Sequence, residues 1–479
     1  MSLAKRIAMN SAALLATNVA NKLTGFLIML SIARFLGAER FGLYSYVFAY
    51  VAAFSLATDL GLTTVVIRGI SQGDEKGRAW LGHALLIRWL FALLSCMAAF
   101  LCALSFYGRV ERTWLIALSS LSFLTAPLAT STAVFNARLM LYGPALVSLA
   151  SRLVLFAVIQ WIARSGGSLA ALIGSEVLLG SLANIFLWLW SRSLLRPVFR
   201  LDVAAVRQML GEGVPLFMTS VFVALYLRID VFFLGHYWSE TAIGIYAAAY
   251  RLTEALPLVA SAVASSIFPV MCQQVHEGNE IFLVKLVRIS LKILLAGIVP
   301  VVMLLSFYSN LVTRLLYGTR FEGSATLLAI LAWGEILVFA NILFSTLIIA
   351  RGKSGLLMRI TFGMLVLNVA LNYLIIPIYG AVGAALTTVG TELVGTVVCL
   401  AATSMTRPLV LAVSRLLVPV AACGFILGVA ARGSQAWNIQ SLWPAIAIGI
   451  LYPVSIYLFR VFDMGEWRGL RELVWPQTR

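Results

Sequence analysis

Long apolar runs, separated by short polar and often basic connections, make up nearly the whole chain. The apolar positions do not recur with a period of 2 or 3.6 but fill stretches of about 20 residues, the length that spans the hydrocarbon core of a bilayer. We therefore predict an all-α integral membrane protein with about 14 transmembrane helices. The predicted helices are residues 12–33, 42–67, 80–105, 114–136, 143–163, 168–190, 214–236, 241–270, 290–313, 324–350, 356–378, 381–404, 409–430 and 442–460.

Composition strengthens this interpretation. Of the 479 residues, 61% are hydrophobic and only 11% are charged, whereas soluble domains carry roughly 25% charged residues. The start of the chain, "MSLAKRIAMN", has a basic flank, and the apolar run after it lacks a small-residue cleavage site. We therefore expect this first run to remain as a helix and not to be removed as a signal peptide.

Two short motifs occur twice. "RFLGAERFGLYSY" (34–46) joins the first and second predicted helices, and "FFLGHYWSETAIGIYAAAY" (232–250) joins the seventh and eighth. "AALIGSEVLLG" (170–180) in the sixth helix likewise matches "AALTTVGTELVG" (384–395) in the twelfth. Both matches are six helices apart, which predicts two parallel six-helix bundles related by an axis along the membrane normal.

The repeat sets the predicted domain boundaries. Between the two halves, "SRSLLRPVFRLDVAAVRQMLGEG" has a helical apolar pattern with several arginines, which is typical of an amphipathic segment on a membrane surface. The predicted domains are an N-terminal six-helix bundle at 1–190, a cytoplasmic amphipathic linker at 191–213, a C-terminal six-helix bundle at 214–404, and appended helices 13 and 14 with a cytoplasmic tail at 405–479.

The positive charge predicts the topology. The net charge is +16, and connections alternate between strongly and weakly basic along the chain. If the N-terminus is cytoplasmic, the strongly basic connections all lie in the cytoplasm, as the positive-inside rule requires. Both termini are then cytoplasmic. The charge does not indicate a nucleic-acid partner, because no basic soluble domain is present to bind one.

Charged residues inside the predicted helices are the candidate site. A cation deep in the bilayer costs about 2.5–3.5 kcal/mol on insertion scales, so such groups normally face a partner or water. We predict that the cations line a shared water-filled cavity for an anionic ligand, and that the carboxylates serve ion coupling or structural pairing. The predicted ligand-binding residues are Lys22, Arg228, Arg251, Arg88 and Arg152; the carboxylates are Asp59, Asp230, Glu254, Glu176 and Glu392.

Structural alternatives accompany these predictions. Arg251 and Glu254 are spaced i, i+3 and could simply pair. Arg228 and Asp230 are two residues apart, so on a regular helix they face different directions and cannot neutralise each other well. Lys22 lies in a polar patch with Asn18, Asn21 and Thr24, which favours the cavity.

Glu176 and Glu392 hold matched places in the repeat. A shared role in tying helices together and a role in ion coupling both remain open for this pair.

Signals for catalysis are weak. "RGKSG" (351–355) imitates the end of a phosphate-binding loop, but Leu347 stands where that loop needs a glycine, and a membrane helix precedes it in place of a strand. His83, His236 and His276 lack metal-ligand spacing. We expect no enzyme activity, no metal and no cofactor; a proton or sodium gradient is the candidate driving force.

Several longer phrases resemble a known family. They are "ARFLGAERFGLYSY", "TDLGLTTVVIRG", "RIDVFFLGHYWSETAIGIYAAAYRLTE", "LLYGTRFEGSATLLAILAW" and "LNVALNYLIIPIYGAVGAALTTVGTE". Together with the six, six and two arrangement of helices, they are similar to the polysaccharide-transporter branch of the multidrug/oligosaccharidyl-lipid/polysaccharide (MOP) exporter superfamily, the Wzx-type flippases.

The resemblance implies a function. It implies a flippase in the bacterial inner membrane whose bundles open alternately to each side. The implied substrate is undecaprenyl-diphosphate carrying an oligosaccharide repeat unit for O-antigen, capsule or exopolysaccharide synthesis. The implied partners are this lipid-linked oligosaccharide, membrane lipids, a polysaccharide polymerase and glycosyltransferases.

Three other functions remain open at this point. A lipid II flippase handles the same diphosphate chemistry. A drug/cation antiporter of the same superfamily would need a cavity dominated by carboxylates, whereas the deep charges here are mixed. A non-transporting membrane scaffold of a polysaccharide assembly machine would tolerate loss of the deep cations.

The charge pattern predicts that the connection from Arg34 to Arg40 is external. A single cysteine in this connection, in a chain without its native cysteines, should react with an impermeant maleimide added outside intact cells or spheroplasts. Reaction from the cytoplasmic side alone would contradict the topology.

Overall fold

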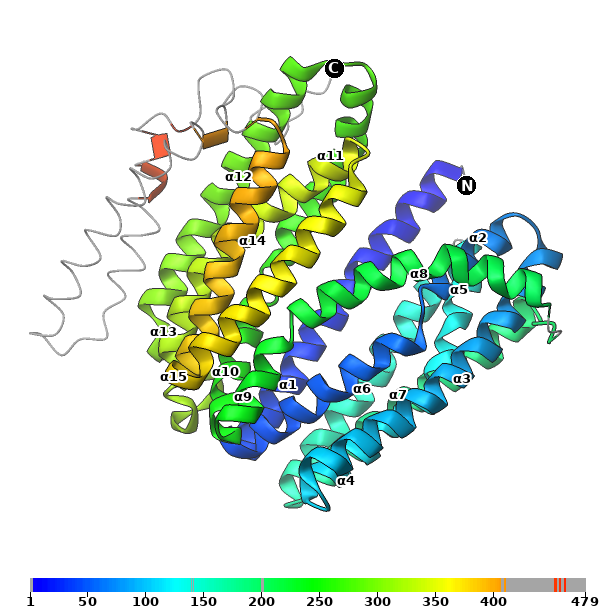
Figure 1. The fold of residues 1–479 in the computed structure, drawn as a ribbon, viewed down its shortest axis with the longest axis horizontal. Helices are drawn as coiled ribbons and strands as arrows, with labels where there is room; N and C mark the ends of the chain where they lie inside the picture. Colours follow the sequence, from blue (N-terminus) through cyan, green and yellow to red (C-terminus); the bar gives the residue numbers. More distant parts are fainter. Residues whose placement is uncertain are drawn as a thin grey trace, which may run out of the picture. The chain divides into compact units, whose positions relative to one another are not determined.

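The described part of the chain is helical. The computed structural model describes residues 3–138, 140, 142–199 and 202–405, with a few positions at 409–410, 452–454, 456–457 and 461 (Figure 1). Within these residues there is no strand, and nine segments are long and apolar enough to cross a membrane. The predicted fold class, an all-α integral membrane protein, is confirmed. Predicted helices 13 and 14 fall almost entirely outside the described residues.

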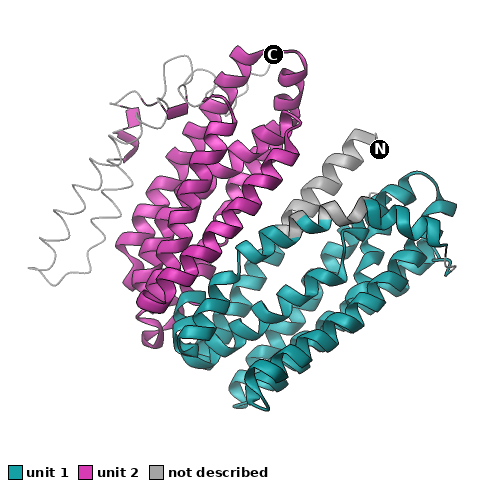
Figure 2. Cartoon of the chain, in the orientation of Figure 1, with its two compact units in different colours: residues 1–247 teal, residues 248–479 magenta. Residues whose placement is uncertain are grey.

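The chain forms two compact units, residues 1–247 and 248–479 (Figure 2). The division into bundles at 1–190 and 214–404 rests on the sequence repeat and stays a prediction. The helices are α1 Leu3–Ser55, α2 Leu62–Ser71, α3 Asp74–Tyr107, α4 Glu111–Ser120, α5 Thr132–Ala137, α6 Tyr142–Arg164, α7 Leu169–Leu194, α8 Val203–Tyr226, α9 Ile229–Tyr237, α10 Glu240–Thr253, α11 Pro257–His276, α12 Glu280–Phe307, α13 Ser309–Tyr317, α14 Ser324–Ala350 and α15 Ser354–Ala402.

Two of these helices contain a glycine break. Gly37 in α1 has φ 71° and Gly380 in α15 has φ 57°. Both values lie in the left-handed region, which glycine adopts without the steric cost that a Cβ brings. Each break falls between two predicted helices, so α1 and α15 each correspond to a pair of consecutive helices.

Other breaks were not predicted. The expected helix 42–67 is interrupted between α1 and α2, where Leu60 and Gly61 have φ values of 51° and 70°. The expected helix 214–236 is interrupted at Leu227 and Arg228, between α8 and α9. An apolar run reports only that a segment is buried or faces lipid, so hydropathy cannot reveal a break whose backbone groups are satisfied inside the protein.

The predicted linker is divided between three structures. α7 continues to Leu194, residues 195–199 have no regular secondary structure, and α8 begins after Asp202, whose side chain accepts hydrogen bonds from the N–H groups of Ala204 and Ala205. The linker is attached to α3. The N–H of Val198 donates to the carbonyl of Arg78, and the N–H of Asp202 donates to Nε2 of His83. His83 therefore has a structural use.

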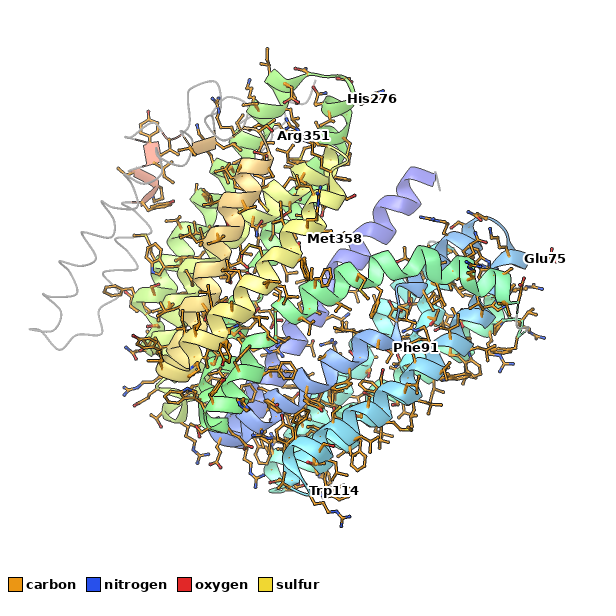
Figure 3. All side chains as sticks on the ribbon, viewed as in Figure 1. Glu75, Phe91, Trp114, His276, Arg351 and Met358 are labelled. Carbon is orange, nitrogen blue, oxygen red and sulfur yellow. The ribbon has the colours of Figure 1, made fainter. Side chains whose placement is uncertain are left out.

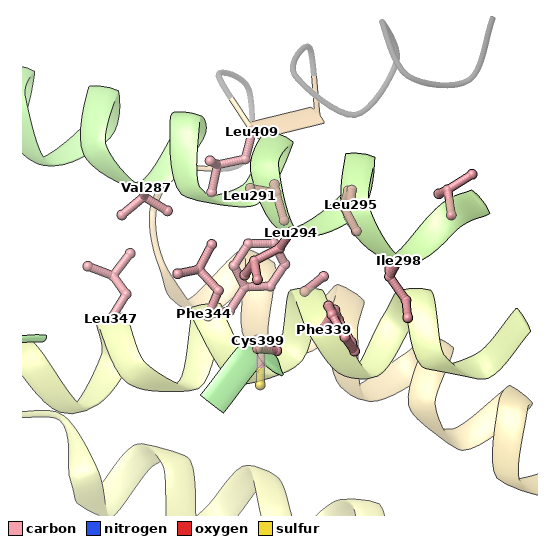
Figure 4. Packing of buried hydrophobic residues seen from close by; sticks show 14 of the residues in the cluster. Val287, Leu291, Leu294, Leu295, Ile298, Phe339, Phe344, Leu347, Cys399 and Leu409 are labelled. Atoms are coloured by element: carbon pink, nitrogen blue, oxygen red, sulfur yellow. The ribbon is translucent and has the colours of Figure 1, made fainter. Parts of the chain in front are cut away.

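Unit 2 has a continuous apolar core. Side chains of α12, α14 and α15 interdigitate there, with Leu291 and Ile298 facing Phe339 and Phe344, and Cys399 reaching the same cluster (Figure 4). These side chains are almost fully buried. The large buried set on one face of α12 and α14 fixes how these three helices pack.

Unit 1 packs around α1 and α3. The α1 helix lies against α6, and α3 packs against α2. A smaller core cluster under α2 and α3 includes Val65, Val66, Trp80 and Leu81. This arrangement holds the first half of α1, which carries Lys22, beside α6, which carries Arg152.

Candidate functional site

Lys22 and Arg152 lie in the same part of unit 1. Both side chains are exposed. A Cβ built on Gly25 of α1 would lie 2.7 Å from Nη1 of Arg152, so the guanidinium lies across α1 at this glycine. Gly25 is three residues after Lys22 and shares its helix face. The Arg152 guanidinium therefore lies about one helical turn along α1 from Lys22, another of the predicted cations. Neither forms a hydrogen bond or an ion pair within the described residues.

The polar neighbours of Lys22 hold α1 against α6. Asn21 donates from Nδ2 to the carbonyl of Ala145 at 3.2 Å, and its Oδ1 accepts from Ser148 at 3.2 Å. Further along the same pair of helices, Gln160 donates to Ser31 at 2.8 Å. Side-chain hydrogen bonds between membrane helices contribute about 0.6 kcal/mol each on average. The polar patch therefore fixes the α1–α6 contact from which Lys22 and Arg152 project.

Arg88 occupies a different environment. It is 5% exposed, and its guanidinium forms a 2.9 Å ion pair with Asp59. It also donates to the backbone carbonyl of Thr58 at 2.9 Å and to the hydroxyl of Thr130 at 2.6 Å. The Thr58 carbonyl is one of the backbone groups freed by the break between α1 and α2. This placement favours a structural role for Arg88 over ligand binding.

Arg228 and Asp230 lie at the break between α8 and α9. Asp230 is 5% exposed and accepts hydrogen bonds from the N–H of Val231 and from the hydroxyl of Tyr246. Arg228 is partly buried. The backbone leaves helical geometry at Arg228, where φ is −135°, so the regular helix assumed for these two charges is not present there. That the two charges do not neutralise each other stays a prediction.

Arg251 pairs with Glu254. The Nη1–Oε2 distance is 2.6 Å, and the two side chains are 28% and 39% exposed. This is the i, i+3 alternative that the sequence left open. Exposed pairs of this kind contribute at most about 1 kcal/mol to stability, so the interaction leaves Arg251 free to exchange partners.

The matched carboxylates Glu176 and Glu392 both bind polar side chains of another helix. The hydroxyl of Tyr44 in α1 donates to Glu176 at 2.6 Å, and Nδ2 of Asn341 in α14 lies 3.5 Å from Glu392. These contacts favour the helix-tying role for the pair, and ion coupling by Glu392 remains compatible with them.

The duplicated motif forms a close helix crossing in unit 1. Gly42 from the first copy lies against the backbone of Glu240, and Gly244 from the second copy lies against the backbone of Ala38. A Cβ at either glycine would overlap the facing carbonyl oxygen. The two copies therefore meet at their equivalent glycines, where the absence of side chains lets the backbones touch.

The tyrosines that follow these glycines have parallel roles. Tyr44, two residues after Gly42, donates to Glu176, and Tyr246, two residues after Gly244, donates to Asp230. Each copy of the motif thus couples a glycine contact to a tyrosine–carboxylate bond. Both copies of the motif therefore share a tyrosine–carboxylate hydrogen bond as well as a glycine contact.

A charged cavity of about 370 Å³ lies beside the crossing. Arg112 pairs with Glu240 at 3.0 Å and covers the rings of Tyr46 and Tyr107, with its Cζ 4.6 and 5.0 Å from their centroids. Arg40 pairs with Glu111 at 2.5 Å at the cavity's exposed edge. These pairs add polar contacts to the glycine crossing, so the end of unit 1 is held by both packing and charge.

Two buried charges lie outside the predicted set of site residues. Lys292 in α12 is 1% exposed and Glu335 in α14 is 7% exposed. Glu335 lies near the carboxylate of Glu392, and its Oε2 has no hydrogen-bond partner. The only signal in the sequence was a charge inside an apolar run, which does not tell whether the side chain faces the core.

Arg351 explains the misleading "RGKSG" motif. Arg351 lies at the end of α14 (Figure 3). Its guanidinium donates to the carbonyl of Thr403 and pairs with Glu280 at 2.6 Å. The motif therefore ties α14 to the start of α12 and the end of α15. Among the described residues no group of three metal-ligating side chains occurs.

The chain is similar to known proteins in both sequence and fold. Residues 31–326 match the family described as "Polysaccharide biosynthesis protein". Over 402 residues, 82% of each chain, the sequence is 26% identical to the probable low-salt glycan biosynthesis flippase Agl15 of Haloferax volcanii.

Two solved structures share the fold. The lipid II flippase MurJ in an inward closed conformation has a TM-score of 0.73 at 15% identity, with 95% of this chain and 99% of that chain covered. An inward-facing multidrug resistance MATE family transporter of the MOP superfamily has a TM-score of 0.63 at 16% identity, with 81% and 96% covered.

The Arg88 cluster generates a stability prediction. Arg88→Ala leaves the Thr58 carbonyl and the half-exposed Asp59 carboxylate without this partner, and it should lower stability by about 1–3 kcal/mol. Arg40→Ala removes an exposed pair and should cost about 0–1 kcal/mol. The fraction of purified protein that stays monodisperse after heating would measure both. Equal heat resistance of the two variants would contradict the structural role of Arg88.

The glycine crossing generates a second prediction. Gly42→Leu and Gly244→Leu should force the two motif copies apart. A cysteine at Leu43, which is 3% exposed beside the crossing, should then react faster with a water-soluble maleimide. Gly180→Leu on α7 is the matched control, because a Cβ there meets nothing within 4 Å. Unchanged labelling of position 43 in the Gly42 and Gly244 variants would show that the crossing does not need bare backbone.

Proposed function

The chain belongs to the polysaccharide biosynthesis protein family, in the polysaccharide branch of the MOP exporter superfamily, and on this premise we propose that it flips an oligosaccharide linked to a polyprenyl diphosphate. The head of such a substrate is polar and anionic, whereas its tail is apolar. The tail can therefore remain in the bilayer while the head crosses through a hydrated space.

The observation that carries the proposal is the pair formed by Lys22 and Arg152. Two exposed cations project from apolar helices at one contact, without an ion pair in the described residues. Placing like charges together in a membrane protein is unfavourable unless water or an anion compensates them. A diphosphate supplies that anion, since arginine binds phosphate oxygens through its planar fork and lysine acts as a point charge.

The alternative functions agree less well with the positive charge of Lys22 and Arg152. A transporter for cationic drugs would need carboxylates where this site presents Lys22 and Arg152. A scaffold without transport would gain nothing from exposed charges inside the bilayer. A lipid II flippase remains the related alternative, because it also carries a diphosphate.

Transport by alternating access is part of the proposal. The crossing of Gly42 and Gly244, with the Arg112–Glu240 pair beside it, would close the external end of the path and separate when that end opens. The basic connections support an inner-membrane orientation with both termini in the cytoplasm. We retain a proton or sodium gradient as the driving force, with Glu392 as its candidate carboxylate.

The remaining predicted residues receive separate roles. Arg251 would contact the substrate head by exchanging its exposed partner Glu254. Arg228 would contribute charge next to Asp230, and Arg88 with Asp59 would maintain the broken helix. Polysaccharide polymerase and glycosyltransferases are the expected functional partners, since they consume and supply the lipid-linked repeat unit.

Substitutions of the cation pair test the proposal. Lys22→Ala and Arg152→Ala should each reduce glycan export at least tenfold, because the diphosphate loses a charge partner worth about 1.4 kcal/mol or more. Lys22→Arg keeps the charge and should retain part of the activity. The measurement is surface glycan in a strain that lacks its own flippase, with the protein level in the membrane measured in parallel.

The control for this test is Arg164→Ala. Arg164 is an exposed cation on the same helix as Arg152 but lies at its end, and its loss should leave export unchanged. Normal export by both alanine variants would overturn the cationic site. Failure of the wild-type chain to restore export with any lipid-linked glycan would overturn the flippase function itself.

A further inference from the structure

The charged cavity of unit 1 lies where several helix ends meet. Its lining residues come from the end of α3, the starts of α4 and α10, and the second half of α1, which begins at the Gly37 break. In the predicted topology the connections next to these helix ends all lie on the external side. The volume of about 370 Å³ falls within the range of small-molecule sites, about 300–1,000 Å³. The cavity is therefore large enough for a ligand and faces the external compartment.

The cavity carries charges of both signs. Arg40 pairs with Glu111, and Arg112 pairs with Glu240. The third carboxylate, Glu39, is exposed and forms no hydrogen bond or ion pair within the described residues. A guanidinium only donates hydrogen bonds, and an ionised carboxylate only accepts them. A ligand in the cavity would thus meet donors and acceptors side by side.

This mixture of charges disfavours an ionic ligand. Both arginines already have a carboxylate partner, so a phosphate group would have to displace that partner and would also meet Glu39. A cationic ligand would meet two guanidinium groups. Among the described residues no three side chains are placed to hold a metal ion. An uncharged ligand with several hydroxyl groups fits better, because each hydroxyl both donates and accepts hydrogen bonds.

The two arginines are held to different degrees. The Arg112 side chain is 17% exposed, and its guanidinium stacks on Tyr46 and Tyr107, whose hydroxyls are hydrogen-bonded to each other. These contacts fix the donor before a ligand arrives, which lowers the entropy lost on binding. The Arg40–Glu111 pair is 50% and 56% exposed, and such pairs contribute at most about 1 kcal/mol. It can therefore open and bind hydroxyl groups instead.

Apolar groups complete the cavity. Tyr107 and Val110 line it beside the charges, with Val110 47% exposed and Leu43 almost fully buried beneath them. Gly108, with φ 71°, ends α3 and turns the chain so that Val110 directly precedes Glu111 at the start of α4. A pyranose ring carries hydroxyls around its rim and C–H groups on its faces. It needs polar groups next to an apolar surface, and this cavity has both.

We propose that this cavity binds an uncharged sugar residue of the glycan at the external end of unit 1. The inference rests on the proposed function, which supplies a glycan and assigns only its diphosphate to Lys22 and Arg152. The sugar subsite is separate from that cationic pair and differs from it in chemistry, because carboxylates outnumber arginines in it. It would hold the glycan on the external side once the head has crossed.

The probe for this subsite is the glycan repeat unit without tail or phosphate. It would be released by mild acid from the lipid-linked glycan of a strain in which the chain restores export, then labelled with a fluorophore and titrated into the full-length chain in lipid nanodiscs. Glu39→Ala and Glu111→Ala should each weaken binding about tenfold, because the hydroxyls lose a charged acceptor. Glu39→Gln should have intermediate affinity, since its amide oxygen still accepts hydrogen bonds.

The matched control is Glu322→Ala. Glu322 pairs with Arg314 at 2.9 Å and is 56% exposed, as Glu111 is in its pair with Arg40, but it lies in unit 2 outside the cavity. This variant should bind the probe as the wild type does. If Glu322→Ala loses as much affinity as Glu111→Ala, or if Glu39→Ala and Glu111→Ala both bind normally, the sugar subsite is wrong.

A cysteine at Val110 locates the bound probe. In a chain without its native cysteines, saturating repeat unit should slow the reaction of Val110→Cys with a water-soluble maleimide about threefold or more, because the ligand would cover this exposed wall of the cavity. The reaction of Glu322→Cys should not change. Equal reaction rates of Val110→Cys with and without the repeat unit would overturn the assignment to this cavity.

Competitors test the class of ligand. Inorganic diphosphate should not displace the probe; displacement would place the probe at a cationic site and overturn the proposal. Removal of divalent cations with a chelator should leave the affinity unchanged. A loss of binding in chelator would show that a metal ion holds the ligand, and it would equally overturn a sugar subsite made by these side chains alone.

The results separate this inference from the proposed function. If the wild-type chain restores glycan export but the cavity variants bind the repeat unit normally, the sugar subsite is wrong and the flippase function stands. If the wild-type chain restores export of no lipid-linked glycan, the proposed function is wrong and the subsite fails with it.

Discussion

Inside a bilayer, backbone groups and charges must find partners within the protein, and the unusual features of this chain follow from that constraint. The break between α1 and α2 frees the Thr58 carbonyl, and the buried Arg88 satisfies it while pairing with Asp59. The break before α9 places Asp230 where a backbone N–H and the Tyr246 hydroxyl can bind it. At each of these two breaks, a buried charge and a backbone group of the interrupted segment are bound to each other.

The same constraint distinguishes the exposed cations from the cations that have a carboxylate partner. Arg88 and Arg251 each form an ion pair with a carboxylate. Lys22 and Arg152 form no ion pair with any of the described residues, and the Arg152 guanidinium lies across α1 at Gly25, three residues from Lys22. A deep charge that has a partner can be explained by architecture alone. Two like charges without such a partner need another explanation, and the anionic substrate that we propose would supply it.

The sequence predicted the fold class, because long apolar runs can be recognised in the sequence itself. The duplicated motif and the helix separations at Gly37 and Gly380 could be predicted as well, because short glycine-containing connections interrupt these runs. It did not predict the interruptions at Leu60 or Arg228, since an apolar run looks the same whether its helix is continuous or broken. For the same reason it grouped Arg88 with Lys22. Depth in the membrane can be read from position in a run, but the direction in which a side chain points cannot.

The glycine crossing also limits how this end of the molecule can vary. At most positions a series of side chains of increasing size changes a contact by degrees. At Gly42 and Gly244 even a methyl group would overlap a carbonyl oxygen, so the smallest substitution, alanine, would already disrupt the contact. Size-graded substitution at these two sites would behave as a threshold, with the whole response appearing at alanine and larger residues adding little. A second substitution, in the partner glycine, would then act on helices that the first had already separated.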